Sequence, residues 1–235
     1  KENNKIEPTI SVVGGGATGI QFLFEIAHFV KRKNINCNLQ LINNNERVLG
    51  RFPASLSEYT ENKMSDLNIK SYSNTYCQKQ EKNIILLTSK EKNHEFELPS
   101  LLTLFFTGNN SENRLSANSF GQAVINNKTL RDIYIAGDCS NYNSLGSNTM
   151  TAQSAVRKGR LAACNILRDS SVLKIFEPYL HPDLGYVISL GPEDAVGWIA
   201  KENNVVDGTS ALLLKEIVES QYDLLLATGM DTYIM

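Results

Sequence analysis

The sequence has no long apolar run and no excess of positive charge. A helix that spans a bilayer needs about 18–20 predominantly apolar residues, and no segment approaches that length, so the sequence offers no candidate for one. The 23 basic and 25 acidic residues give a formal net charge of -2. Nucleic-acid-binding proteins usually present a basic surface, so we predict no nucleic-acid partner.

Paired cysteines and clustered histidines are also missing. The four cysteines are Cys37, Cys77, Cys139 and Cys164, and the three histidines are His28, His94 and His181. No CxxC pair occurs, and the histidines do not join the cysteines at the spacing of metal ligands. We therefore predict reduced thiols, no metal site and a cytoplasmic location.

A nucleotide-binding unit is indicated near the start of the sequence. Thr9–Val13 (TISVV) is a β-branched run that ends in glycines, and Asn38–Ile42 (NLQLI) is a second apolar run. Between them, apolar residues follow at helical spacing from Ile20 to Val30. Basic residues come next at Lys31–Lys33, where they suit the end of a helix dipole. The predicted order is strand, glycine loop, helix, strand.

The glycine loop, Gly14–Gly19, has the pattern GxGxxG. In this context Gly14 permits a tight turn, Gly16 lets a pyrophosphate approach the backbone, and Gly19 lets the helix pack closely on the strand. Free amides at the helix start can bind phosphate oxygens. We therefore assign dinucleotide binding to Gly14, Gly16, Ala17, Thr18 and Gly19, with a purely structural glycine turn as the alternative.

Asn43 stands at the end of the second strand, where such units usually carry a carboxylate. That carboxylate binds the ribose hydroxyls and disfavours a 2′-phosphate. Asparagine can still hydrogen-bond a ribose, and Glu46 is a second candidate, so NADH and NADPH both remain open. For Arg47 we favour a solvated surface charge over a phosphate ligand.

The middle of the chain predicts a helix over Leu56–Leu67 and strands over Asn83–Thr88 and Leu101–Thr107. The last of these, which leads to Gly108, is apolar enough to be buried on both faces of a parallel sheet. An ordinary core strand is the favoured interpretation, and Gly108 is retained as a candidate cofactor contact.

A second motif follows. Asp132–Ala136 (DIYIA) predicts a strand that leads into Gly137 and Asp138, and residues 152–163 predict a helix rich in small residues. An aspartate at a strand end can hold a polyol hydroxyl while helix amides receive a phosphate. The alternative for Asp138 is a turn or capping residue.

These strings resemble the pyridine nucleotide-disulfide oxidoreductase family, closest to type II NADH dehydrogenases. VVGGGATGIQFLFEI resembles the NAD(P)H motif, and IYIAGDCS with TAQSAVRKGRLAACNIL resembles the second flavin-contacting motif. The tail FEPYLHPDLGYVISLGPEDAVGWI is similar to the C-terminal region of the dehydrogenases. The resemblance implies that Gly137 and Asp138 hold the FAD ribityl chain. It also implies that Ala152 and Gln153 lie beside the flavin and quinone.

The sequence departs from this family in three places. The FAD-binding βαβ unit that should precede the NAD(P)H motif is absent, so we expect an excised portion that retains FAD poorly. Gln21 stands where the family often has a glutamate near the nicotinamide, so a proton relay there is in doubt. Arg157 and Lys158 replace a common pair of glutamines. We favour solvated helix charges, with cations that favour a reduced flavin or an anionic acceptor as the alternative. Gln21 and Gln153 are the candidate catalytic positions.

We expect an α/β fold with three regions. These are a three-layer Rossmann-type NAD(P)H-binding domain (1–112), a remnant of the FAD-binding domain (113–168) and a small C-terminal α+β domain (169–235). The predicted function is hydride transfer from NADH or NADPH to FAD, with a quinone as the electron acceptor. A soluble-acceptor or disulfide reductase and a non-catalytic dinucleotide-binding module are the alternatives. Ser210–Leu226 predicts a helix that packs on the core or on a second copy in a homodimer, and contact with the cytoplasmic membrane face is the minority interpretation.

Overall fold

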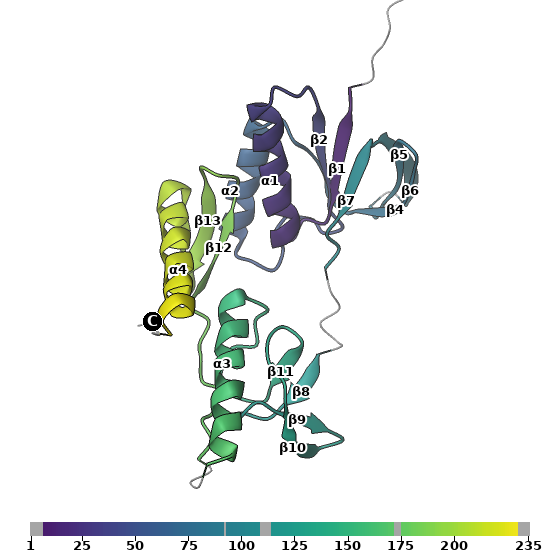
Figure 1. Cartoon of the computed structure of the whole chain (residues 1–235). Coiled ribbons are helices and arrows are strands. Elements are labelled where there is room, and N and C mark those ends of the chain that lie inside the picture. Colours follow the sequence, from purple (N-terminus) through teal and green to yellow (C-terminus); the bar gives the residue numbers. More distant parts are fainter. Residues whose placement is uncertain (1–6, 92, 109–113, 172–174, 230–235) are drawn as a thin grey trace, which may run out of the picture. The chain divides into compact units, whose positions relative to one another are not determined.

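A computed structural model describes residues 7–91, 93–108, 114–171 and 175–229 (Figure 1). The chain forms two compact units. Unit 1 combines the described residues up to Gly108 with those from Gly185 onward, and unit 2 holds the described residues between them. The division into three domains stays a prediction.

Unit 1 is built on a parallel sheet with the strand order β3-β2-β1-β7. Its strands are β1 (Thr9–Val13), β2 (Asn38–Ile42), β3 (Lys70–Tyr72) and β7 (Leu102–Phe105). Helix α1 (Ala17–Arg32) joins β1 to β2, and α2 (Ala54–Asp66) precedes β3. Together they confirm the predicted α/β fold.

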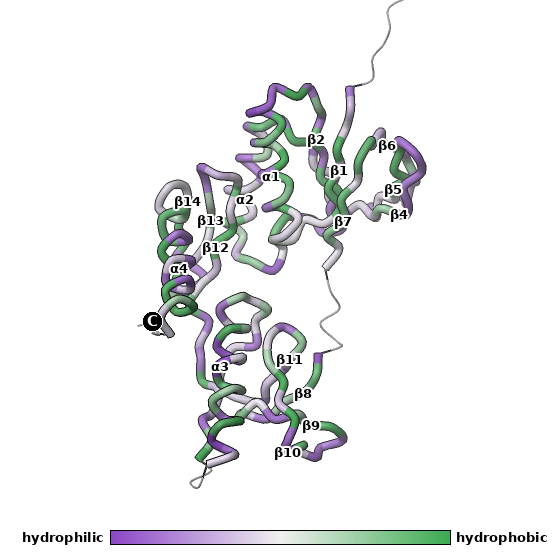
Figure 2. Tube along the Cα trace, in the orientation of Figure 1, coloured by the Kyte–Doolittle hydropathy of each residue, from purple (hydrophilic) through white to green (hydrophobic). Residues whose placement is uncertain are grey.

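Residues of β1 and β2 alternate between the two faces of this sheet, as the pleat requires. Val12 and Leu41 are fully buried against the apolar sides of α1 and α2, which contribute Leu23 and Leu56. The tube of Figure 2 is largely green, and so apolar, along β1 and α1. One face of the sheet is therefore the helix face.

The opposite face carries Val13 and Ile42, which pack on Ile85 and Leu87. Ile85 and Leu87 belong to an antiparallel sheet of β4 (Thr75–Glu81), β5 (Ile84–Ser89) and β6 (His94–Pro99). The third layer of the nucleotide domain is thus a small β-sheet.

Strand β7 corrects one expectation. It lies at the edge of the parallel sheet, paired only with β1 among the described strands. The side chains of Leu102 and Phe105 are 47% and 53% exposed. The strand is therefore not buried on both faces of the sheet.

The C-terminal part of unit 1 consists of the antiparallel strands β12 (Gly185–Ser189), β13 (Ala195–Ile199) and β14 (Lys201–Asp207), followed by α4 (Gly208–Thr228). Ile188, Leu190 and Val196 join the core formed by α1 and α2. The small sheet therefore shares its core with the nucleotide domain.

Helix α4 is only partly covered. Ala211 is fully buried, but Ile217 and Val218 on the predicted packing face are 49% and 38% exposed. Packing on the core is thus confined to part of the helix, and a dimer or membrane contact stays a prediction. Among the described residues, no helix is both long and apolar enough to cross a bilayer.

Unit 2 contains a sheet with the strand order β10-β9-β8-β11 and the long helix α3 (Ala152–Asp169). The strands are β8 (Leu115–Ala117), β9 (Gln122–Ile125), β10 (Lys128–Tyr134) and β11 (Ser140–Tyr142). Leu161 of α3 packs on a cluster that includes Ala123, Ile135 and Tyr142. This packing fixes α3 beside the strands (Figure 1).

Candidate functional site

The glycine loop crosses the carboxyl end of the parallel sheet, between β1 and α1. The Gly14 amide donates to the carbonyl oxygen of Ile42 at 2.8 Å, which ties the loop to β2. Gly14 has φ +118, and a Cβ atom there would overlap the carbonyl oxygen of Phe106. A Cβ atom on Gly19 would overlap the carbonyl oxygen of Gly14. Both positions therefore require glycine for space.

Gly16 is different, because a Cβ atom there would meet nothing within 4 Å. This residue is exposed and forms the N-cap of α1, with no side-chain cap and no acidic residue in the first turn. The first amides of a helix have no partner within the helix, so they are suited to bind an anion. Ala17 and Thr18 supply these first positions, and Thr18 is exposed. The open side of the loop therefore fits a pyrophosphate.

Asn43 lies beside the loop, but its side chain is already engaged. It is 2% exposed, and its amide group donates to the carbonyl oxygens of Asn45 at 3.1 Å and Arg47 at 3.0 Å. A Cβ atom on Gly15 would lie 2.7 Å from its Cγ atom, so the carboxamide also contacts the glycine loop. Asn43 thus shapes the loop that follows β2, and both amide N–H donors point into that loop.

Arg47 is also a structural residue, which corrects its interpretation as a solvated surface charge. Its guanidinium donates to Ser57 Oγ at 2.7 Å and to the carbonyl oxygens of Gly50 at 3.2 Å and Phe52 at 2.9 Å. These bonds join the loop after β2 to the start of α2. The side chain is half-buried.

Two further candidates stand near this edge. Gly108 follows β7, is exposed and has φ +81. Gln21 is half-buried on the second turn of α1. Next to it, the ring of Phe22 stacks on Phe106 with ring centroids 4.8 Å apart. Phe106 was not predicted from the sequence as a residue of this edge. The signal that could have indicated it is its place directly after a strand that runs parallel to β1.

In unit 2 the second motif forms the acidic turn, Gly137–Ser140. Gly137 has φ +75, and Asp138 is exposed. The turn is closed by the Ser140 amide, which donates to the carbonyl oxygen of Gly137 at 3.1 Å. Strand β10 ends at Tyr134, so Ile135 and Ala136 connect the strand to the turn. The Asp138 carboxylate is placed to accept hydrogen bonds from solvent or from a polyol.

Helix α3 begins at Ala152 and is capped by Thr151, whose Oγ1 accepts from the Ser154 amide at 3.2 Å. The preceding amides, at Ala152 and Gln153, belong to the first turn, where an anion or a flavin carbonyl could bind. Gln153 is half-buried. Unit 2 therefore fits the ribityl and ring portions of a flavin with the acidic turn and this helix start.

Lys158 corrects a second expectation about charge. It is 1% exposed and is not a solvated helix charge. Its ammonium donates to the carbonyl oxygen of Ser140 at 3.4 Å, which links α3 to the acidic turn. Arg157, its neighbour, is half-buried. This burial was not predicted, because lysine in a helix usually lies on the solvent side.

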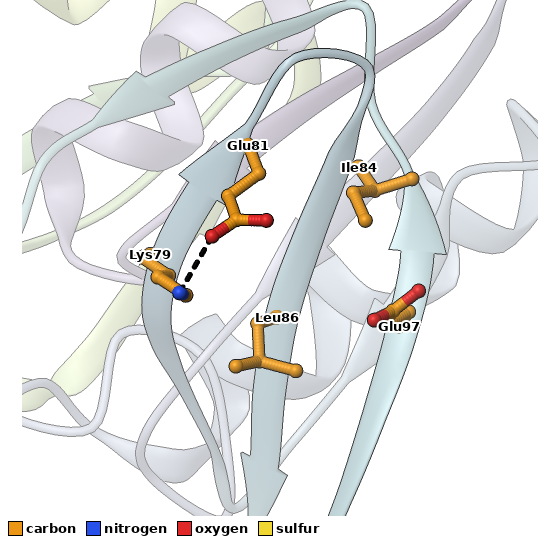
Figure 3. Close-up of a pocket in the computed structure, with 5 residues that line it drawn as sticks. All are labelled: Lys79, Glu81, Ile84, Leu86 and Glu97. Carbon is orange, nitrogen blue, oxygen red and sulfur yellow. Dashed lines mark ion pairs between the residues drawn. The ribbon is translucent and has the colours of Figure 1, made fainter.

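Other hollows lie away from both motifs. One of about 120 Å³ sits on the antiparallel sheet of unit 1, where Lys79 pairs with Glu81 at 2.6 Å across from Glu97 (Figure 3). Another, of about 340 Å³, is lined in part by His28, Lys63 and Asp194. In the part of the chain that is described, no group of three or more His, Cys, Asp and Glu side chains could hold a metal ion.

The family model for pyridine nucleotide-disulphide oxidoreductases matches residues 2–159. The chain belongs to this family. The motifs predicted this family, and the α/β fold agrees with that of the solved structures that it resembles.

Among its relatives is a type II NADH:quinone oxidoreductase of Staphylococcus epidermidis, 24% identical over 237 residues, which cover 94% of this chain and 58% of the relative. The structure of NDH2 from Plasmodium falciparum in complex with NADH superposes with a TM-score of 0.76 at 16% identity, over 89% of this chain and 61% of the other. The sulfide:quinone oxidoreductase of Aquifex aeolicus gives 0.69 at 16% identity, over 98% and 61%. The predicted closeness to type II NADH dehydrogenases is confirmed, and the chain spans about three fifths of these relatives' length.

Proposed function

We propose that the whole protein oxidises NADH or NADPH with bound FAD and passes the electrons to a quinone. The observation that carries this proposal is the open space at Gly16, which faces the uncapped start of α1. Membership of the oxidoreductase family supports it. When bound, the flavin supplies the chemistry of accepting a hydride and releasing electrons singly or in pairs.

Unit 1 contributes the binding of the nicotinamide nucleotide. The amides at Ala17 and Thr18 receive the pyrophosphate, and Gly16 permits close approach because it has no side chain. Gly108 lies at the same edge of the sheet and leaves room for the nucleotide. Gln21 can orient the nicotinamide carboxamide by hydrogen bonding, but it cannot take up a proton.

Unit 2 contributes the binding of the flavin. Asp138 accepts hydrogen bonds from ribityl hydroxyls, and Gly137 gives the turn its left-handed backbone. The amides at Ala152 and Gln153 bind the ring, and we assign the half-buried Gln153 side chain to the acceptor. These roles need no proton transfer by a side chain, because positioning dominates hydride transfer between stacked rings.

The choice between NADH and NADPH depends on the loop after β2. The Asn43 amide donates within that loop. We therefore assign the selectivity for the nucleotide to side chains nearer solvent, and Glu46 is one that is exposed. A carboxylate there favours two free ribose hydroxyls over a 2′-phosphate. We therefore propose NADH as the preferred donor.

The test is an anaerobic titration of the full-length protein with NADH and with NADPH, followed by the flavin absorbance. Bleaching by NADH that a quinone analogue reverses is the expected result. Bleaching that a soluble disulfide or dye reverses, but a quinone does not, would assign the protein to the reductase alternative. A flavin that stays oxidised although NADH binds would make the protein a non-catalytic module and end the proposal.

A further inference from the structure

Two cations lie behind the acidic turn of unit 2, and the reaction outlined above uses neither. Lys158 is 1% exposed, although an ammonium group can donate three hydrogen bonds. Among the described residues it has one hydrogen bond, the long contact with the Ser140 carbonyl oxygen, and no ion pair with a carboxylate. The rings of Tyr142 and Tyr179 also lie nearby, with centroids 5.2 Å and 5.7 Å from Nζ.

Arg114 is the second cation. Its Nη1 donates to the carbonyl oxygen of Asn148 at 2.8 Å, whereas its Nε atom is buried and has no hydrogen-bond partner among the described residues. The Asn148 side chain in turn bonds the backbone of Tyr142 in both directions at 2.8 Å. The two cations therefore brace the same short strand, β11, which begins at the acidic turn.

Charge links these cations to Asp138. Burial lowers the pKa of Lys158, and Arg114 lowers it further, while Asp138 acts in the opposite direction. A buried cation with so few partners is unfavourable for folding, and an apolar residue of similar volume is often neutral or stabilising in its place. Packing alone gives no reason for a lysine at this position.

We propose that Lys158 is a positioning residue for the flavin. The Lys158 ammonium fixes the acidic turn and makes the site electropositive. The inference rests on the proposed function, because it assumes that the flavin lies at Asp138. Fixed positive charge beside the flavin site favours the flavin after it has accepted electrons, when it carries more negative charge. Lys158 thereby raises the midpoint potential of the bound flavin.

The experiment compares full-length wild-type protein with Lys158→Met, which keeps the apolar stem and removes the charge. Lys128→Met is the matched control, because Lys128 is exposed on β10 of the same unit. We measure the affinity for FAD, the flavin midpoint potential and the temperature of unfolding. A second variant, Lys158→Gln, keeps one donor for the Ser140 carbonyl and covers the case in which the methionine variant does not fold.

For both Lys158 variants we expect the preference for reduced over oxidised flavin to fall about tenfold, which is about 30 mV for a two-electron couple. The unfolding temperature of the Lys158 variants should stay equal or rise. Lys128→Met should change neither the midpoint potential nor the unfolding temperature. An unchanged potential with FAD bound, or an equal loss of affinity for both flavin states, would overturn the inference alone. A wild-type protein that binds no FAD would overturn the proposed function and this inference with it.

Discussion

The glycine loop of unit 1 is shaped by close backbone contacts, whereas the acidic turn of unit 2 lies against buried positive charge. In the first, Gly14 and Gly19 leave no room for a Cβ atom. In the second, a Cβ atom on Gly137 would meet nothing within 4 Å, and Lys158 approaches the turn from α3. One site depends on space, and the other depends on charge.

This difference separates two kinds of substitution. Adding a methyl group should damage the glycine loop at Gly14 but be tolerated at Gly159, inside helix α3 of unit 2. Removing a charge should leave the glycine loop intact but weaken the flavin site.

Gly14→Ala should have the largest effect. The methyl group would overlap the Phe106 carbonyl oxygen, and φ +118 is a strained backbone conformation for alanine. We expect a loss of about 3 kcal/mol or more in the free energy of unfolding. Denaturant unfolding of the full-length protein measures it. A change below about 1 kcal/mol would show that the loop relaxes and that the close contact is not decisive.

The glycine loop is the part of the molecule that sequence reasoning predicts best, because its motif is local. Strand β1, the loop, α1 and β2 follow within Thr9–Ile42, and each was expected. The packing of β12 and β13 on α1 and α2 was not expected. It joins segments separated along the chain by roughly the length of a typical domain, so no local pattern indicates it. Of the three strands in the antiparallel layer, only the one near Asn83–Thr88 was expected, because β4 is largely polar.

Charged side chains were predicted less well than glycines. A helical pattern shows which residues share a face, but it does not show that a lysine on that face is buried. Lys158 and Arg114 come from segments far apart in the sequence, so their common environment follows from the fold alone. Arg47 was misjudged although its partners lie 3 to 10 residues away, because a loop has no periodic pattern that shows which side chains meet.

Gly16→Ala should separate nucleotide binding from folding. Because a Cβ atom there meets nothing within 4 Å and the backbone is extended, at φ -79 and ψ 176, the fold should be unaffected. The methyl group would instead meet the pyrophosphate, at a cost of about 1–3 kcal/mol, which corresponds to about a tenfold to hundredfold loss of NADH affinity. Isothermal titration with NADH measures this loss. Unchanged affinity at an unchanged unfolding temperature would place the pyrophosphate elsewhere.

Asp138→Asn tests the role of charge in unit 2. The amide oxygen can still accept a hydrogen bond, but hydrogen bonds to charged groups are stronger by about 1 kcal/mol, so FAD affinity should fall about fivefold. Asp132→Asn is the control, because Asp132 is exposed on β10. Fluorescence titration of the deflavinated full-length proteins gives both affinities. Equal affinities in the two variants would remove Asp138 from the flavin site.

Gly159→Ala should have the smallest effect, and its sign is favourable. Gly159 lies inside α3, and a Cβ atom there would meet nothing within 4 Å. Alanine is favoured over glycine in a helix interior by about 0.5–1 kcal/mol, so unfolding should require slightly more denaturant while FAD affinity stays the same. A gain here beside a loss at Gly14 would show that the same methyl group has opposite effects in a crowded turn and at an open helix position. A loss of stability in the full-length protein would instead reveal that a segment outside the described residues packs on this side of α3.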